Sequence, residues 1–231
     1  MLFFNDVSIS SFPGLMVEDI RVSPIQYAPL ARQRPIRFGA EFVRISGGSR
    51  TVAVTFAVLE QDREARAMLL MDVRKWARSV DIGKLQVTGY PDMHLMAGCT
   101  EFSEHSSRQW WEDSLKVVFT AYEPYWLSDD EKSVPCGTDV LIAGSAPPKM
   151  RIVRTLSSAA SNQSWSDGTD TITLSSVPAG RLTIDLDRQT IDVDGQSVMS
   201  GFTFGSSFIR PKIGQMNISG AGTVIWQERW E

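Results

Sequence analysis

The feature that most constrains the fold of this chain is the alternation of apolar side chains with small or polar ones in short runs. In residues 50–59 the apolar positions from Val52 to Val58 alternate with Thr and Ala, and residues 113–122 repeat the pattern. A period of two places alternate side chains on one face of a half-buried strand. The sequence therefore predicts a mostly β protein.

One segment, residues 62–80, has helical spacing instead. Its apolar residues recur three or four positions apart, at Ala65, Leu69, Val73, Trp76 and Val80. Asp62 can cap the first turn, and the basic residues between Arg74 and Arg78 suit the negative end of the helix dipole. We expect a single helix that ends before Gly83, with the Trp76 side chain and the rest of its apolar stripe packed on the N-terminal sheet.

Residues 22–37 carry three prolines, Pro24, Pro29 and Pro35, and few periodic apolar residues. Because proline lacks a backbone N–H, the segment is predicted to be neither a helix nor a central strand. Two interpretations stay open, an extended arm that embraces a neighbouring molecule and an ordinary long surface loop.

The second half of the chain follows a charged break at residues 128–132 and a proline at position 135. We expect a domain boundary there, with an N-terminal domain of residues 1–130 and a C-terminal domain of residues 131–231. In the C-terminal domain, short β-prone runs separated by Gly, Asn, Asp and Pro recur at regular spacing. This pattern is typical of a β-sandwich.

Turn signals subdivide the C-terminal domain. The Asp194-Gly195 pair predicts a type I′ hairpin between two short strands, because both residue types accept positive φ values. Residues 220–222, Gly-Ala-Gly, predict a second hairpin turn, and residues 157–166 predict a polar loop.

Charge and composition exclude several classes of function. The chain has 231 residues and a formal net charge of -4, whereas sequence-independent binding of nucleic acid depends on clustered Lys and Arg. The first residues do not resemble a signal peptide, and no apolar run approaches the roughly 18 residues of a membrane-spanning helix. We expect a soluble protein without membrane insertion. The two cysteines, Cys99 and Cys136, predict no disulfide framework, although a single bridge between them stays open.

No motif in the sequence is typical of an enzyme. The chain has no Gly-x-Ser-x-Gly motif and two histidines, so a Ser-His-Asp triad has few ways to form. A carboxylate pair for glycoside hydrolysis stays open as an alternative, because such pairs meet in space and not in sequence. We expect no enzymatic activity and no organic cofactor.

Metal binding is also not expected. Four potential zinc ligands are present, His94, Cys99, His105 and Cys136. Their wide separation differs from the short ligand spacing of zinc sites. Four aspartates look like a calcium cluster, Asp185, Asp187, Asp192 and Asp194. They alternate with apolar residues, which places their carboxylates on the solvated face of two strands and not in one tight loop.

Tryptophan is the remaining lead to a binding site. Its side chain can stack on a sugar ring, but packing in cores and interfaces is its more frequent role. In the C-terminal domain, Trp165 is the candidate for contact with a glycan.

Three stretches of the sequence occur in a specific combination. Residues 115–126 read LKVVFTAYEPYW, the chain opens with LFFNDVSISSFPGLMV, and the closing region contains an Asp-Gly hairpin. In that closing region Pro211, Gly214 and Asn217 form a Pro-x-x-Gly-x-x-Asn segment, which precedes an aromatic-rich last strand. The combination resembles the distal tail proteins of siphophages, in the same order and over nearly the whole chain.

The resemblance implies a fold and an assembly. The N-terminal domain would be a β-sandwich with one helix and a hairpin or arm, closing into a hexameric ring, and the C-terminal domain a galectin-like β-sandwich outside it. The ring would be the hub that joins the tail tube to the tail tip, with the tail tube protein and the tail-tip proteins as further partners. DNA would pass through its channel without specific binding. The implied location is the tip of the virion tail, after assembly in the host cytoplasm.

Arginine is concentrated around the predicted arm, at Arg32, Arg34, Arg37, Arg44 and Arg50. These residues are candidates for ion pairs with carboxylates of the next subunit of a ring, and a solvated basic face is the alternative. The alternative function is a glycan-binding adhesion module of the tail tip, with Trp165 as its contact residue. Hydrolysis of the cell wall at the tail tip is a more distant alternative.

Overall fold

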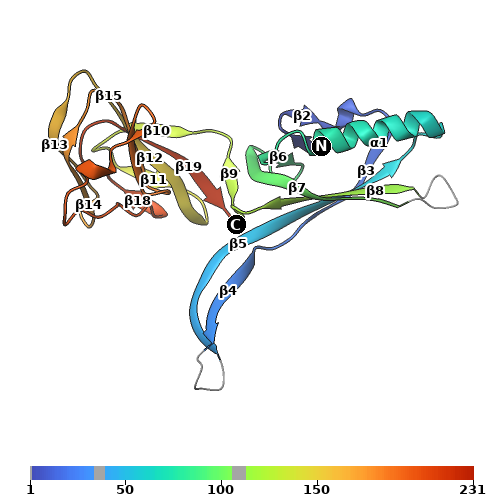
Figure 1. The fold of residues 1–231 in the computed structure, drawn as a ribbon, viewed down its shortest axis with the longest axis horizontal. Coiled ribbons are helices and arrows are strands. Elements are labelled where there is room, and N and C mark those ends of the chain that lie inside the picture. Colours follow the sequence, from blue (N-terminus) through green and yellow to red (C-terminus); the bar gives the residue numbers. More distant parts are fainter. Residues whose placement is uncertain (1, 34–39, 106–112) are drawn as a thin grey trace. The chain divides into compact units, whose positions relative to one another are not determined.

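The structure is a computed structural model, which describes residues 2–33, 40–105 and 113–231, with the backbone alone for residues 28–33 and 40–47. The chain divides into two compact units, Met1–Tyr125 (unit 1) and Trp126–Glu231 (unit 2). Both units consist mainly of antiparallel strands, as the alternation in the sequence predicts (Figure 1).

Unit 1 contains the helix and a curved antiparallel sheet. In chain order its elements are β1 (Leu2–Phe4), β2 (Val7–Ser8), the 3-10 turn η1 (Ile9–Ser11), β3 (Leu15–Val22), β4 (Gln26–Gln33), β5 (Ala40–Val58), α1 (Arg63–Ala77), β6 (Gly83–Val87), β7 (Met93–His105) and β8 (Ser114–Ala121). The strand order is β3-β5-β8-β7-β6-β1-β2, and β4 pairs with the first half of β5.

The alternating runs form the centre of this sheet. Strand β5 pairs with β8 from Arg50 opposite Ala121 to Ala57 opposite Ser114. The alternate apolar side chains of both strands are buried, at Val52, Val54, Phe56, Val58, Leu115, Val117, Phe119 and Ala121. The period of two in the sequence therefore predicted both the strands and the face that they bury.

Helix α1 begins at its predicted cap. Asp62 Oδ1 accepts hydrogen bonds from the backbone N–H groups of Glu64 (3.1 Å) and Ala65 (2.8 Å). The helix ends at Ala77, three residues earlier than expected, and Gly83 begins strand β6.

Trp76 anchors this helix to the sheet, as predicted. Its side chain is 5% exposed, and its indole N–H donates a hydrogen bond to the carbonyl oxygen of Val7 (3.3 Å). Three phenylalanine rings surround it, with centroid distances of 6.0 Å to Phe4, 5.7 Å to Phe12 and 6.1 Å to Phe119. The indole thus connects α1 to β1, to the segment after η1 and to β8.

The proline-containing segment forms one strand of a hairpin. Strand β4 includes Pro29 and pairs with residues 40–49 of β5, with register shifts after Tyr27 and after Leu30. Proline is tolerated there because β4 has no described partner on its other edge. The extended arm is therefore a two-stranded β-ribbon, and Pro35 lies outside the described residues.

Unit 2 is a β-sandwich. Its elements are β9 (Trp126–Ser128), β10 (Lys132–Pro135), β11 (Val140–Ile142), β12 (Ala146–Leu156), β13 (Ala160–Ser166), β14 (Thr171–Val177), β15 (Gly180–Asp185), β16 (Thr190–Val193), β17 (Gln196–Ser197), the 3-10 turn η3 (Met199–Gly201), β18 (Gly214–Met216) and β19 (Thr223–Trp230). One sheet has the order β17-β16-β15-β12-β19, with β9 and β10 also paired to β19. Two small sheets, β11-β18 and β13-β14, contribute side chains to the same core.

Strand β9 belongs to unit 2, because Trp126 and Leu127 pair with Trp230 and Arg229 of β19. The expected boundary after residue 130 placed this strand in the first domain. The polar, charged segment at residues 128–132 comes after this strand, whereas the boundary between the compact units comes before it. Local composition therefore does not mark that boundary.

The turn signals gave one correct and two wrong predictions. Val193 pairs with Gln196 across Asp194 and Gly195, whose φ values of 50° and 80° fit the predicted type I′ turn. Residues 220–222 do not form a hairpin, because β18 before them pairs with β11 and β19 after them pairs with β10 and β12. Residues 160–166 of the predicted polar loop form strand β13, which pairs with β14.

We predict that Trp76→Ala lowers the stability of unit 1 by about 3–5 kcal/mol, through lost apolar burial and the cavity that remains. This is a large part of the ~5–15 kcal/mol that stabilises a typical domain. Differential scanning calorimetry should show the transition of unit 1 at a lower temperature and that of unit 2 unchanged. Met71→Ala is the matched control, because Met71 lies exposed on the same helix. Equal melting of the Trp76 variant and the parent would contradict the anchoring role of the indole.

Candidate assembly surfaces

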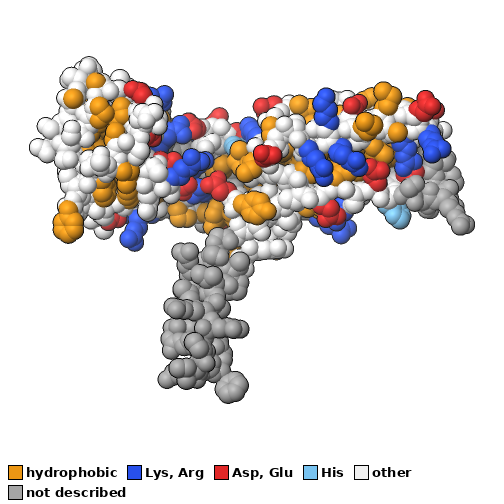
Figure 2. All heavy atoms as spheres, viewed as in Figure 1, with side chains coloured by type: hydrophobic (Ala, Val, Ile, Leu, Met, Phe, Trp, Pro, Cys, Tyr) orange, Lys and Arg blue, Asp and Glu red, His pale blue; other side chains and the backbone are white. Residues whose placement is uncertain are grey.

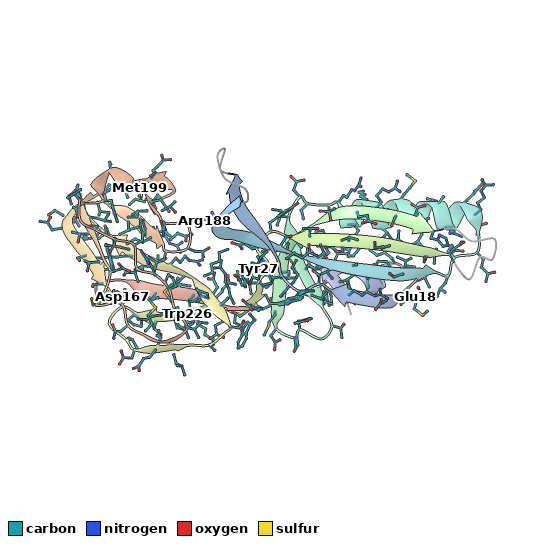
Figure 3. The ribbon with its side chains drawn as sticks, turned by 90° about the horizontal axis from the view of Figure 1, so that it is seen from below. Glu18, Tyr27, Asp167, Arg188, Met199 and Trp226 are labelled. Atoms are coloured by element: carbon teal, nitrogen blue, oxygen red, sulfur yellow. The ribbon has the colours of Figure 1, made fainter. Side chains whose placement is uncertain are left out.

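The longest open edge of unit 1 runs along β3 and β4. Strand β3 pairs with the second half of β5 and β4 with the first half, and no described strand pairs with their outer edge. Glu18 on β3 and Tyr27 on β4 mark this edge in Figure 3. Unpaired N–H and C=O groups along an edge strand are a template for a strand of another chain.

The apolar side chains of β3 are only half-buried, at Leu15, Val17, Ile20 and Val22. Their partners across the ladder, such as Phe56 opposite Val17 and Val54 opposite Ile20, are fully buried. The core of unit 1 is therefore well covered in its centre and poorly covered at this edge.

The β4–β5 ribbon extends beyond the sheet. Residues 40–49 of β5 pair with β4 and with no other described strand, because the pairing with β8 begins at Arg50 (Figure 1). At its base, Thr51 N–H donates a hydrogen bond to Ser23 Oγ (2.9 Å) and Ser23 N–H to the carbonyl oxygen of Thr51 (2.9 Å). Two strands alone are marginally stable in water, so such a ribbon is suited to pack against another surface.

The predicted interface arginines occupy three different situations. Arg32 and Arg44 lie on the ribbon, where Arg32 is opposite Glu41 and Arg44 is opposite Leu30 in the register. Arg50 lies at the start of the β5–β8 ladder and is 5% exposed. Arg34 and Arg37 lie outside the described residues. The structure thus places Arg32 and Arg44 on the ribbon and buries Arg50 within the described chain.

An apolar groove of about 680 Å³ runs between α1 and the segment after η1. Phe12, Pro13, Met68, Leu69 and Trp76 provide its apolar lining, and the polar groups at its border include Glu60, Asp72 and Lys75. Met68 is 67% exposed, and Figure 2 shows apolar and basic side chains side by side over α1.

The basic side chains of α1 gather next to this groove. Met71, Arg74, Lys75, Arg78 and Ser79 line an adjacent hollow of about 610 Å³. Arg74 pairs with Glu104 (2.9 Å) and lies over the ring of Phe102 (4.8 Å to its centroid). Nearer the start of the helix, Arg66 pairs with Asp113. Lys75 borders both the groove and the hollow.

Trp165 lies in the core of unit 2 and not on its surface. Its side chain is 1% exposed, and its indole N–H donates a hydrogen bond to the carbonyl oxygen of Ala221 (2.8 Å). Gly220 has a φ of 128° and lies so close that a Cβ atom there would be 2.5 Å from Trp165 Cδ1. The indole therefore offers no exposed face for stacking on a sugar.

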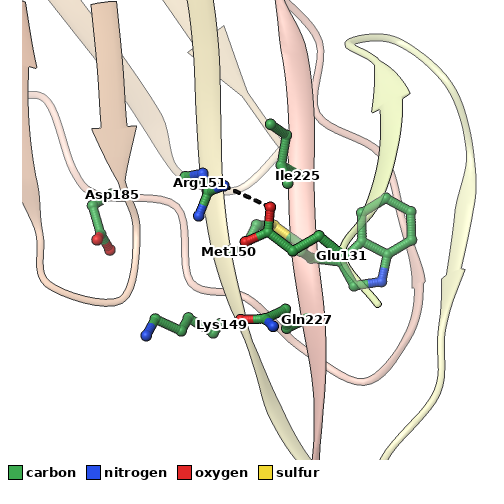
Figure 4. Close-up of a pocket in the computed structure, with 8 residues that line it drawn as sticks. Glu131, Lys149, Met150, Arg151, Asp185, Ile225 and Gln227 are labelled. Atoms are coloured by element: carbon green, nitrogen blue, oxygen red, sulfur yellow. Dashed lines mark hydrogen bonds and ion pairs between the residues drawn. The ribbon is translucent and has the colours of Figure 1, made fainter. Parts of the chain in front are cut away.

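A small polar pocket of about 20 Å³ lies on the larger sheet of unit 2. Figure 4 shows Glu131, Lys149, Arg151 and Asp185 around it, with Arg151 paired to Glu131 at 2.7 Å. Such a volume accommodates about one water molecule. It is too small for an organic substrate.

The candidate calcium ligands have structural roles in turns. Asp185 Oδ1 accepts hydrogen bonds from the backbone N–H groups of Asp187 (3.0 Å) and Arg188 (2.9 Å), and Asp194 Oδ1 accepts one from Arg181 (3.1 Å). Asp187 forms a two-point ion pair with Arg229, at 2.7 and 3.0 Å. Within the described ranges, no three His, Cys, Asp or Glu side chains are grouped to hold a metal ion.

Cys99 and Cys136 are free thiols, which lie in unit 1 and unit 2 respectively. Partial burial raises the pKa of both thiols, because it disfavours the charged thiolate. The neutral thiol is therefore favoured over the thiolate at both positions.

Sequence reasoning did not find two features of the surface. The α1 groove depends on residues from two separate segments. The helical stripe had predicted that Ala65 and Leu69 pack on the sheet, whereas Ala65 is exposed and Leu69 is half-buried, and both line the groove. In unit 2 the side chain of Phe204 is fully exposed. The adjacent Gly205, a turn residue with positive φ, is the one local signal for that exposure.

Comparisons with known proteins gave matches among solved structures alone. No protein family and no curated protein matches the sequence. In the described part of the chain, no helix has the length and apolar character needed to cross a membrane.

Three structures illustrate the likeness. The Dit protein (gp 19.1) of phage SPP1, a paradigm of the hub adsorption apparatus in phages that infect Gram-positive bacteria, aligns over 100% of this chain and 98% of its own, with a TM-score of 0.74 and 13% identity. Two structures of the phage P2 baseplate in its activated conformation, with Ca and with Sr, each cover 96% of this chain and 92% of their own. Their TM-scores are 0.49 and 0.46, at 9% and 10% identity. The resemblance to distal tail proteins is therefore confirmed at the level of the fold: the chain has the fold of the SPP1 Dit protein along its whole length.

Proposed function

We propose that this chain is a distal tail protein of a phage, which forms a hexameric ring at the tail tip and joins the tail tube to the host-adhesion apparatus. The support from comparison is the shared fold with SPP1 Dit over both units. Folds host many functions, so the proposal also needs support from the surfaces of this chain.

The observation that carries the proposal is the open β3–β4 edge with its protruding ribbon. A ring needs a heterologous interface, in which one surface of a subunit contacts a different surface of the next and the rotation closes. In the single chain the apolar residues of β3 are only half-buried, and the ribbon has no described third strand. A neighbouring copy along this edge would bury these apolar residues and pack against the ribbon.

The charge of the chain fits a conduit for DNA. A formal net charge of -4 and the absence of a grouped metal site in the described ranges suit a wall that neither grips phosphate nor acts on it. Tail tube and tail-tip proteins are the proposed partners, with assembly in the host cytoplasm before incorporation into the virion. The role is structural and not enzymatic.

We expect the purified chain, alone or with its tail partners, to form six-fold rings. Negative-stain electron microscopy would show the ring directly, and light scattering should give six times the chain mass of 25.7 kDa. A strictly monomeric mass at high concentration, together with no ring in a tail assembly, would contradict the proposed function.

A second prediction separates the ribbon's role in assembly from a role in folding. We would remove residues 27–48 and join Gln26 to Ser49 through an inserted Asn-Gly dipeptide. Gln26 and Ser49 face each other in the ladder, so a two-residue turn can connect the two strands. The Ser23–Thr51 hydrogen bonds at the base are retained. Rings should be lost while the melting temperature of unit 1 changes little.

The matched control for this excision is Gly220→Ala. It should lower the stability of unit 2, where the added Cβ meets Trp165, and leave rings intact at temperatures at which unit 2 stays folded. If the ribbon variant loses folded structure as completely as it loses rings, the ribbon is a structural part of unit 1 and not an assembly arm.

A further inference from the structure

An exposed phenylalanine stands on a rigid turn of unit 2. Residues 203–206 form a β-turn in which Ser206 N–H donates to the carbonyl oxygen of Thr203 (3.1 Å). Gly205 has a φ of 87°, the value that the third position of a type II turn requires. Phe204 precedes it, and its side chain is fully exposed.

Hydrogen bonds fix this turn against strand β14. Thr203 N–H (3.0 Å), Thr203 Oγ1 (3.2 Å) and Ser206 Oγ (3.3 Å) all donate to the carbonyl oxygen of Thr173. Thr173 N–H donates to Ser206 Oγ (3.1 Å), and Ser207 N–H to the carbonyl oxygen of Thr171 (2.8 Å). The turn therefore presents Phe204 in a fixed position.

The other aromatic side chains of this segment face inward. Phe202 and Phe208 stack with a centroid distance of 5.1 Å and pack against the core of unit 2. Phe204, in contrast, does not pack against this core. A large apolar side chain held on a rigid support loses little conformational entropy when it binds, and aromatic residues are enriched in the cores of interfaces.

The groove of unit 1 is large and apolar enough to accept such a side chain. Its volume of about 680 Å³ can accept an aromatic side chain, and Phe12, Leu69 and Trp76 provide apolar contacts. Met68 borders it with a flexible thioether, which adapts to an inserted ring and makes favourable sulfur–aromatic contacts.

An acidic group lies near the Phe204 turn, and basic groups lie on one side of the groove. Asp170 accepts a hydrogen bond from Ser207 Oγ (2.8 Å), which places a carboxylate next to the Phe204 turn. Lys75 borders the groove, and Arg74 and Arg78 line the adjacent hollow. The groove also carries the carboxylates of Glu60 and Asp72, so the attraction depends on the basic side of α1.

We propose that Phe204 of one copy of this chain inserts into the α1 groove of a neighbouring copy. The Phe204 turn and the α1 groove are different surfaces of the same chain, so the contact between two copies is heterologous and can repeat around a ring. The inference rests on the proposed function in one respect, that copies are held side by side. A high effective concentration in the assembly then makes a single-residue contact stable.

Disulfide cross-linking between two variants, each with one introduced cysteine, tests this contact. Both batches carry Cys99→Ser and Cys136→Ser, and one adds Phe204→Cys while the other adds Met68→Cys. After mixing under assembly conditions and mild oxidation, we expect a dimer band on a non-reducing gel. The matched control replaces Phe204→Cys by Leu141→Cys, another strongly exposed apolar side chain of unit 2, and should give no dimer band.

Two results would overturn the contact. One is a 204–68 pair that gives no dimer, or the same dimer as the control pair. The other is a chain carrying both new cysteines that cross-links only within itself. Micrographs of the Phe204→Cys and Met68→Cys batches keep the two proposals distinguishable. Rings without the 204–68 cross-link refute the contact alone, whereas the cross-link without rings refutes the hexameric hub.

Discussion

The fold of unit 1 depends on the backbone pairing of one long strand, β5, along both of its edges. On one edge it pairs with β8 through Arg50–Ala57, and on the other with β3 and then β4. Where pairing occurs on both edges, at residues 52–57, it satisfies the backbone of β5 and places Val52, Val54 and Phe56 in the core. Because the same strand continues into the ribbon, the core of unit 1 fixes the direction in which the ribbon leaves the sheet.

Local signals in the sequence predicted the elements whose residue pattern repeats over a single segment. Asp62 caps α1 and Trp76 anchors it, and the period of two marked the buried halves of β5 and β8. Residues 40–49 of β5 were not predicted because they include Gly47-Gly48 and their partner strand contains Pro29. At Gly48 a Cβ atom would lie 2.5 Å from Ile25 Cγ2, so glycine there reflects close approach and not a break in the strand.

The candidate sites depended on contacts between distant segments, which residue patterns do not contain. Strand β13 is almost entirely polar, and it is a strand because β14 pairs with it and Trp165 packs beneath residues 220–222. Trp165 is buried, so it cannot make the glycan contact that its residue type had indicated. Arg50 is also buried and lies in the β5–β8 ladder, whereas Arg32 and Arg44 lie on the ribbon. The exposed Phe204 is the converse case, since in the sequence it looks like its partly buried neighbours Phe202 and Phe208.

The place of β19 in unit 2 has a consequence for the order of folding during synthesis. This strand, Thr223–Trp230, pairs with β9, β10 and β12, which precede it in the chain by about 70 to 100 residues. Nonlocal pairings of this kind form slowly, and here the main sheet cannot close before residue 230 has left the ribosome. The described strands of unit 1 all lie before residue 122, so this unit can fold first. Nascent chains would then expose a finished β3–β4 edge while unit 2 is still unstructured. If the proposed ring forms along this edge, its assembly could begin on the polysome, between neighbouring nascent chains.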